Sequence, residues 1–215
     1  MTPLRGLYAI IDPERCAGRD PLWVADAVLR GGCALMQLRA KRATDREVLR
    51  LGAALRDRCR ARRVPFVLND RADLAALLGA DGLHLGQDDL PIAEARRLFT
   101  GTIGRSTHDA IQARASVELA DHIGVGPVFA TRSKENAGPE LGISMLREIC
   151  RESPIPTVAI GGITLDNARL AFEAGADMVA MISALSHADA PHTVAARIQE
   201  MGATAAGTVI SEGAR

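Results

Sequence analysis

Two aspartates that each follow a short apolar run carry the clearest chemistry in this sequence. Asp70 follows the run at 65–68 and Asp89 follows the run at 82–85, with a helical pattern up to Gly79 between the two runs. A strand, a helix and a second parallel strand place both strand ends on the same edge of a sheet. We therefore expect Asp70 and Asp89 to face one another across a pocket.

Polar and cationic side chains follow the run at 34–38, in the segment MQLRAK. Gln37, Arg39 and Lys41 occupy alternate positions, and alternate side chains of an extended chain point the same way. The spacing predicts that all three reach one place, although a surface edge without a shared ligand would show the same pattern. A site that binds only an anion would not be expected to place carboxylates among its cations. Mg²⁺, however, is commonly held by one or two carboxylates plus substrate phosphates. These residues therefore predict a magnesium diphosphate site.

A second kind of anion site is predicted where small residues follow two later apolar runs. The pairs Gly161-Gly162 and Ile182-Ser183 each come directly after such a run. Backbone N–H groups that no side chain obstructs bind phosphate well, so we expect a monophosphate there. The alternative is a tight turn that needs glycine for its dihedral angles alone.

A long segment with several glycines and prolines, 126–142, adds further polar groups. Loops of this length in a compact domain are usually functional or mobile, and this one carries Thr131, Ser133 and Lys134. The Lys134 ammonium would join the cations of the diphosphate site. His84 lies within an apolar run and fits either a hydrogen-bonded core histidine or a contact in the site.

Eight apolar runs alternate with helical patterns and predict a (β/α)8 barrel, an α/β TIM barrel, in a single domain over 1–201. The strands are expected at 7–11, 34–38, 65–68, 82–85, 102–106, 122–125, 157–160 and 178–181. The groups described above then fall in loops after strands, where such barrels hold their active sites and often a phosphate. An open doubly wound sheet is the alternative, but Asp12-Pro13 stands after the first strand, where such a sheet would carry a glycine fingerprint.

Capping signals predict where several helices begin. Thr44 precedes a glutamate by three residues, which predicts a capping box, and Asp166 or Thr164 is expected to cap a later helix. The last helix is expected at 190–201. The tail at 202–215 is rich in Gly, Ala, Ser and Thr, and we expect it to be loosely ordered.

The charge balance argues against a broad nucleic-acid surface. The number of Lys and Arg residues (26) equals the number of Asp and Glu residues (26), whereas nonspecific binding of nucleic acid relies on excess positive charge. The most basic segment, RDRCRARR at 56–63, raises a nucleic-acid alternative, but it has no interleaved aromatics, and cations are favoured near a helix C-terminus. We interpret it as a solvent-exposed face.

The cysteines and histidines show no metal-site spacing. The four cysteines include no CxxC pair and the five histidines no HExxH motif, which predicts a reduced, cytoplasmic protein without a structural zinc site. No segment has the length of a membrane span or the pattern of a secretory signal. We expect small-molecule partners, no nucleic acid and no membrane, and the sequence leaves the oligomeric state open, a homo-oligomer included.

Eight motifs in register resemble those of thiamine phosphate synthases along nearly the whole chain. They are LYAIID from Leu7, MQLRAK around Gln37, LNDRADLA around Asn69, GADGLHLGQDDLP from Gly79, IGRSTH from Ile103, GVGPVFATRSK from Gly124, AIGGIT from Ala159 and GADMVAMISA from Gly175. The resemblance implies a (β/α)8 transferase. It would join hydroxymethylpyrimidine diphosphate to hydroxyethylthiazole phosphate, forming thiamine phosphate and releasing diphosphate.

The resemblance also implies roles for individual residues, with Asp70 and Asp89 on Mg²⁺. The residues expected around the pyrimidine diphosphate are Gln37, Arg39, Lys41, Asn69, Ser106 and Lys134. Those expected on the thiazole phosphate side are Thr131, Ser133, Gly162, Ile182 and Ser183. The catalytic groups among them would be Arg39, Lys41, Ser106 and Lys134. The family reaction is expected to be dissociative: diphosphate departs first, and the thiazole nitrogen captures the pyrimidinylmethyl cation.

Two departures and two alternatives accompany the resemblance. Ser133 stands where the family more often has threonine, and Arg105 replaces a commonly apolar residue. Thiazole tautomerases are the nearest alternative on this fold, but they lack the paired aspartates and place a histidine in the stretch that here ends in Pro127, which has no acid or base. A non-catalytic barrel that senses a thiamine precursor would be expected to have lost residues that bind the diphosphate and the metal. Both sets of residues are complete here.

Overall fold

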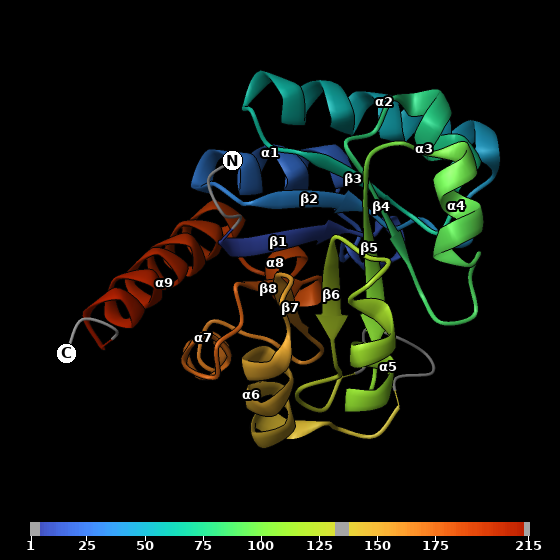
Figure 1. Ribbon diagram of the computed structural model, residues 1–215. Helices are drawn as coiled ribbons and strands as arrows, with labels where there is room; N and C mark the ends of the chain where they lie inside the picture. The colour runs from blue at the N-terminus through green and yellow to red at the C-terminus, as the bar shows by residue number, and fades with distance from the viewer. Residues whose placement is uncertain (1–4, 132–137, 213–215) are drawn as a thin grey trace.

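The protein, seen in a computed structural model that describes residues 5–131 and 138–212, is a closed barrel of parallel strands (Figure 1). The eight strands follow one another in sequence order, and β8 pairs with β1 to close the barrel. Their bounds are β1 Gly6–Ile11, β2 Leu35–Leu38, β3 Phe66–Asn69, β4 Gly82–Leu85, β5 Thr102–Thr107, β6 His122–Val125, β7 Thr157–Ile160 and β8 Met178–Met181. The predicted (β/α)8 barrel is confirmed.

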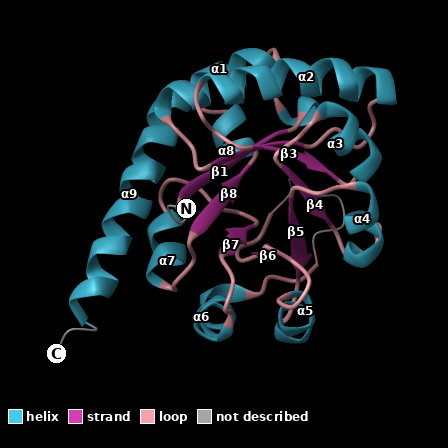
Figure 2. Ribbon diagram, turned by 45° about the horizontal axis from the view of Figure 1, so that its top comes forward, coloured by secondary structure: helices cyan, strands magenta, loops and turns pink. Residues whose placement is uncertain are grey.

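Helices surround the strands in a ring, and α9 reaches beyond the barrel (Figure 2). Their bounds are the 3₁₀ turn η1 Pro13–Arg15, α1 Pro21–Gly31, α2 Asp45–Ala61, α3 Ala72–Leu78, α4 Ile92–Leu98, α5 Ala110–Ser116, α6 Gly142–Glu152, α7 Ala168–Glu173, α8 Ser183–Ser186 and α9 Pro191–Glu212. Thr44 opens α2 with the predicted capping box. Within the described part of the chain, no helix combines the length and apolar character needed to cross a membrane.

The strand register determines which loops are neighbours. In the β3–β4 pair Asn69 lies opposite His84, so Asp70 leaves the barrel beside the loop that leads to Asp89. Parallel pairing throughout puts the C-terminal ends of all eight strands on one face of the barrel. The loops that carry the predicted site residues therefore share that face.

The core has two layers because successive side chains of a strand point to opposite faces. The larger layer packs the outer faces of the strands against the helices. The smaller one fills the barrel interior and consists of Tyr8, Ile10, Leu35, Val67, Val158, Met178 and Ala180. The inner layer forms the floor beneath the loops at the strand ends.

The structure differs from the sequence predictions in three helices. The short helix α8 was not predicted, because four residues are too few to show a helical period. The N-cap residue of α7 is Asn167, and neither Asp166 nor Thr164 caps this helix; the Thr164 N–H instead donates to Asn167 Oδ1 at 2.8 Å.

The last helix does not end at Met201 as expected but continues to Glu212. Gly202 is buried, and a Cβ atom there would lie 2.6 Å from the Gly6 Cα. This glycine therefore permits a close approach of α9 to β1 and does not stop the helix. The last residues of the tail, 213–215, lie outside the described residues, and the looseness expected of them stays a prediction.

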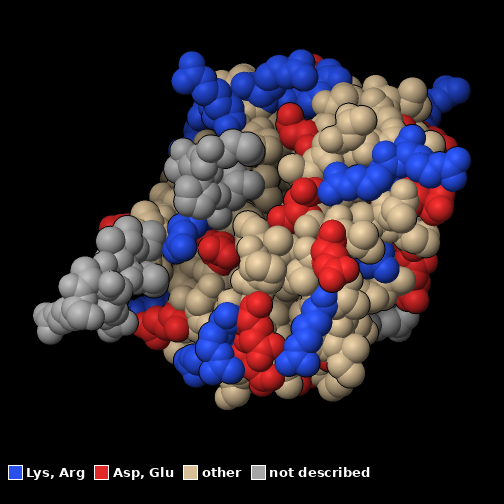
Figure 3. Space-filling model, viewed as in Figure 1, with Lys and Arg blue, Asp and Glu red and all other residues tan. Residues whose placement is uncertain are grey.

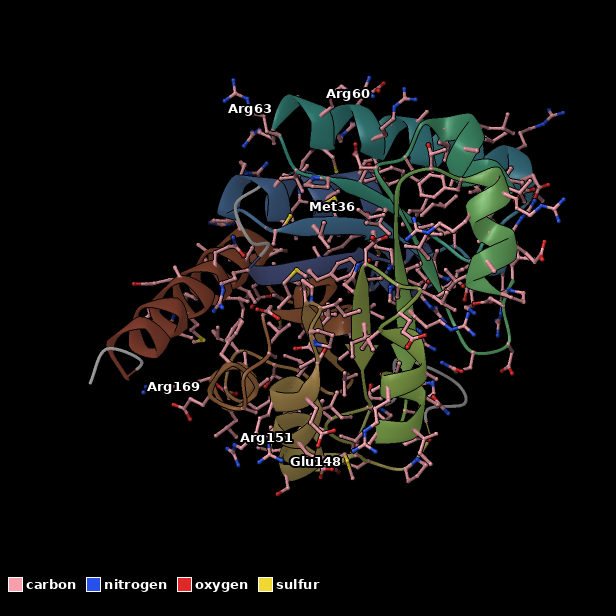
Figure 4. All side chains as sticks on the ribbon, in the orientation of Figure 1. Met36, Arg60, Arg63, Glu148, Arg151 and Arg169 are labelled. Carbon is pink, nitrogen blue, oxygen red and sulfur yellow. The ribbon has the colours of Figure 1, made fainter. Side chains whose placement is uncertain are left out.

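The basic segment 56–63 lies on the outer side of the molecule. Lys and Arg side chains gather over α2 (Figure 3), and Arg60 and Arg63 point away from the barrel (Figure 4). Arg56 instead bridges to the next helix, where its Nη1 donates to the Leu78 carbonyl at 2.6 Å. This arrangement fits the solvent-exposed face that we expected, and the absence of nucleic-acid binding stays a prediction.

Candidate active site

A cavity of about 510 Å³ opens at the C-terminal ends of the strands. It is lined by every predicted site residue that the structure describes, namely Gln37, Arg39, Lys41, Asn69, Asp70, Asp89, Ser106, Thr131, Gly162, Ile182 and Ser183. Two further predicted residues, Ser133 and Lys134, lie outside the described residues. The barrel thus brings together groups from widely separated parts of the chain, and their individual roles stay predictions.

The two aspartates meet as expected from the parallel strands. The Asp70 carboxyl is hydrogen-bonded to that of Asp89, and its Oδ2 lies 3.0 Å from Lys41 Nζ. Asp89 Oδ2 accepts a hydrogen bond from the Gly86 N–H at 2.6 Å. Asp70 has a φ of 65°, in the left-handed region that few residues other than glycine and short polar ones adopt. This turn carries the Asp70 carboxyl toward the β4 loop.

The two carboxyls do not ionise equally readily. Burial raises the pKa of Asp70 to about 6, and the hydrogen bond with Asp89 acts in the same direction, against the effect of Lys41. Burial opposes ionisation of Asp89 too, but the hydrogen bonds from Asp70 and the Gly86 N–H outweigh it and lower the pKa of Asp89. Two like charges in contact resist joint ionisation. Below about pH 6, and with no cation bound, protonated Asp70 therefore donates to ionised Asp89.

In the absence of Mg²⁺, the stability of Asp70→Asn relative to wild type is expected to rise as the pH increases from about 4 to about 7. The Asp70 pKa is about 6 in the folded protein and about 3.9 in the unfolded chain. The stabilising effect of the bound proton is therefore complete below about pH 4 and is lost as the pH rises through about 6. Asparagine resembles the protonated carboxyl at every pH.

Urea unfolding of both proteins across this range measures the difference. The exposed neighbour Asp88, which does not line the cavity, supplies the control Asp88→Asn. A stability difference between Asp70→Asn and wild type that stays constant with pH would contradict the raised pKa of Asp70.

Arg39 is held by the end of β1. Its Nη1 donates to Asp12 Oδ2 at 2.5 Å, and its backbone N–H donates to the Ile11 carbonyl at 2.9 Å. Asp12 is only 3% exposed. We did not predict Asp12 as a functional residue, although it follows a buried strand in the same way as Asp70 does.

The cavity floor combines apolar side chains with a polar network. Tyr8, a buried floor residue, accepts a hydrogen bond at its hydroxyl from Gln37 Nε2 at 2.8 Å, and burial raises the Tyr8 pKa. His84, which we left open between core and site, lines the cavity, and its Nε2 lies 2.9 Å from Ser106 Oγ. Beside it, burial lowers the pKa of His122 to about 4, so this histidine is neutral at pH 7.

The glycine turn lies on the opposite rim, after β7. Gly161 and Gly162 have φ values of 95° and 65°, so the turn does require glycine for its dihedral angles, as the alternative interpretation held. The Gly162 carbonyl accepts a hydrogen bond from Asn167 Nδ2 at 2.9 Å. Next to this turn, Ser183 begins α8 and lines the same cavity. The phosphate role of this rim stays a prediction.

Several lining residues had no signal of their own in the sequence. They are Ile10, His108, Val158, Ile160, Ala180 and His187. The apolar ones are ordinary strand residues whose inward orientation follows from the alternation along each strand. That alternation could have identified them once the barrel was assumed.

A closed (β/α)8 barrel with polar and charged side chains converging at its strand ends defines the class of TIM-barrel enzymes, whose active sites lie on this face. The family model described as thiamine monophosphate synthase matches residues 7–185. The chain belongs to the thiamine monophosphate synthase family, and it is an enzyme of the transferase class.

Individual relatives are similar in sequence to this chain over most of their length. A thiamine-phosphate synthase of Laribacter hongkongensis is 43% identical over 191 residues, covering 87% of this chain and 90% of the relative. One of Natronomonas pharaonis is 43% identical over 206 residues, covering 93% and 96%. The structure of thiamine phosphate pyrophosphorylase from Pyrococcus furiosus superposes with a TM-score of 0.86 at 32% identity, covering 94% of this chain and 98% of that one.

Proposed function

We propose that this enzyme condenses hydroxymethylpyrimidine diphosphate with hydroxyethylthiazole phosphate to give thiamine phosphate and diphosphate. The observation that carries the proposal is the division of one cavity into two unlike rims. Carboxylates and cations line it at the ends of β2, β3 and β4, and the glycine turn and Ser183 line it at the ends of β7 and β8. In this closed order β3 lies across the barrel from β7 and β4 from β8, while β2 and β8 are separated by β1 alone. Two phosphorylated substrates would thus be held with their rings between them.

The acidic pair suits Mg²⁺. Its protein ligands would be oxygens of Asp70 and Asp89, and the charge of the ion would offset the mutual repulsion of the two carboxylates. Among the residues that the structure describes, no group of three or more His, Cys, Asp or Glu side chains could hold a metal ion. The proposed ion would take its other ligands from diphosphate and water, as Mg²⁺ commonly does. Bound there, it would supply positive charge to the diphosphate oxygens.

The side chains of the chain itself would act by position and charge. Arg39 and Lys41 would donate hydrogen bonds to the diphosphate oxygens as negative charge grows on them. The C–O bond to diphosphate would break with its electron pair on the leaving oxygen. The thiazole nitrogen would then form the new C–N bond to the methylene carbon. No protein nucleophile is required.

The floor of the cavity would protect the cationic intermediate. Ile10, Val158 and Ile160 line it with hydrocarbon, and a site that excludes water prevents hydrolysis of a reactive species. Ser106, held by His84, and Gln37, held by Tyr8, would orient the pyrimidine ring. We further infer a reducing, cytoplasmic setting, because Cys16 and the other three cysteines are free thiols.

Incubation of the purified protein with both substrates and Mg²⁺ tests the proposal. We expect thiamine phosphate and diphosphate in equal amounts, and we expect none when either substrate is omitted or EDTA is added. Tight binding of one precursor without turnover would instead indicate a sensor. Isomerisation of a thiazole carboxylate phosphate without condensation would indicate a tautomerase. Either result would overturn the synthase function.

A further inference from the structure

We propose that Asp12 is a positioning residue that orients Arg39 toward the diphosphate and couples it to α8, the helix beside the other phosphate position. The proposal rests on the proposed function, because it names what Arg39 and α8 would bind. It concerns a residue that does not line the cavity. Asp12 would act only through its partners.

The first observation is a buried ion pair between neighbouring strand ends. Asp12 is 3% exposed, and its Oδ2 accepts from Arg39 Nη1 at 2.5 Å. The Arg39 side chain itself is only 17% exposed. A guanidinium group has five N–H donors in a rigid fork. Engaging one of them therefore orients the others, and Arg39 lines the cavity.

The second observation is the use of both Asp12 oxygens. While Oδ2 holds Arg39, Oδ1 accepts from the Glu14 N–H at 3.0 Å and caps the turn η1. The Asp12 carbonyl also accepts from Cys16 Sγ at 3.2 Å. The carboxylate is therefore attached to the segment that follows β1, and it cannot shift without moving that segment.

The third observation is that this segment holds α8. The Arg15 carbonyl, at the end of η1, accepts from Ser186 Oγ at 2.5 Å. Arg19 Nη1 donates to the Ser186 carbonyl at 3.0 Å. Ser186 ends the short helix that Ser183 begins. Arg39, Asp12, η1 and α8 thus form one continuous chain of contacts from the diphosphate rim to the thiazole phosphate rim.

The physical consequence is that Asp12 would orient the Arg39 side chain and Arg39 would bind the diphosphate. A free arginine samples many rotamers, and each rotamer-rich side chain that binding must immobilise weakens affinity. A guanidinium already held by Asp12 is preorganised. Contiguity alone does not establish coupling between two sites, so the test must measure the dependence of one residue on the other.

A double-mutant cycle with inorganic diphosphate supplies that test without requiring turnover. Calorimetry in Mg²⁺ would compare wild type, Asp12→Asn, Arg39→Met and the double variant. We expect Asp12→Asn to weaken diphosphate binding about tenfold, and we expect no further loss when it is added to Arg39→Met. Fully additive losses, or an affinity of Asp12→Asn within about twofold of wild type, would overturn the proposal.

A matched control separates positioning from capping. Asp20 also caps a helix start through its carboxylate, which accepts from the Leu22 N–H at 3.0 Å, but it is exposed. Asp20→Asn should leave diphosphate affinity unchanged. Asp12→Asn could fail to fold because it leaves the buried Arg39 charge without its partner. In that case the comparison of Arg39→Met with the double variant still tests the proposal. A further loss of diphosphate affinity in the double variant refutes it.

Steady-state kinetics test the link to α8. We expect Asp12→Asn to raise KM for both substrates, and Arg39→Met to raise KM for the pyrimidine diphosphate alone. An unchanged KM for the thiazole phosphate in Asp12→Asn would refute the coupling to α8. If the wild-type protein binds diphosphate but forms no thiamine phosphate, the proposed function is refuted. The calorimetric cycle would still test the role of Asp12 in that case.

Discussion

Asp89→Ala and Asp70→Ala are each expected to lower turnover about 100-fold or more. Each change removes one of the two carboxylates proposed to hold the ion at the leaving diphosphate. A catalytic metal ion contributes several kcal/mol of charge stabilisation, and each loss of about 1.4 kcal/mol is tenfold in rate. Excess Mg²⁺ should restore activity only in part, because one ligand remains.

The measurement is the initial rate of thiamine phosphate formation against Mg²⁺ concentration. Asp88→Ala is the matched control, since Asp88 adjoins Asp89 in sequence but is exposed and does not line the cavity. It should retain wild-type kinetics. Wild-type rates and Mg²⁺ dependence in both Asp70→Ala and Asp89→Ala would rule out the metal role of the pair.

Gly162→Ala is expected to raise KM for the thiazole phosphate at least about tenfold and to lower the free energy of unfolding by about 1–3 kcal/mol. Gly162 has a φ of 65°, and a Cβ atom there would lie 2.5 Å from the Ala130 carbonyl oxygen and 2.8 Å from Phe129 Cβ. An L-residue in this conformation is strained, and the nearest clashing atom belongs to the backbone. The turn would move away from the phosphate position.

Substrate titration and urea unfolding measure the two effects separately. Gly138→Ala is the control, because a Cβ atom at Gly138 meets no atom of the described residues within 4 Å. It should change neither KM nor stability. If Gly162→Ala loses stability while its KM for the thiazole phosphate stays at the wild-type value, the turn is structural and holds no phosphate.

The sequence allowed the barrel and most of the cavity lining to be predicted because both depend on local patterns. Short apolar runs end at glycine or at polar residues, and β4, β6, β7 and β8 begin and end where those runs do. Alternation placed Gln37, Arg39 and Lys41 on one side of the chain. Parallel topology then required the loops after β3 and β4 to be neighbours.

Features that depend on contacts between distant segments could not be predicted in the same way. The last helix was expected to end at Met201, but the next residue, Gly202, is buried against Gly6 from the other end of the chain. Asp12 looked like an ordinary strand end, but it is the buried partner of Arg39. The apparent role of each residue changed once its neighbour from another element was known.

The sequence by itself determined the order of strands and helices, the family, and the types of residue at the strand ends, because these follow from periodicity and from motifs within short stretches. Only the tertiary structure decided that burial and Asp89 raise the pKa of Asp70, that His84 holds Ser106 and that Asp12 holds Arg39. Hydrogen bonding and burial depend on distances of a few ångströms between side chains. Those distances arise only when the barrel closes.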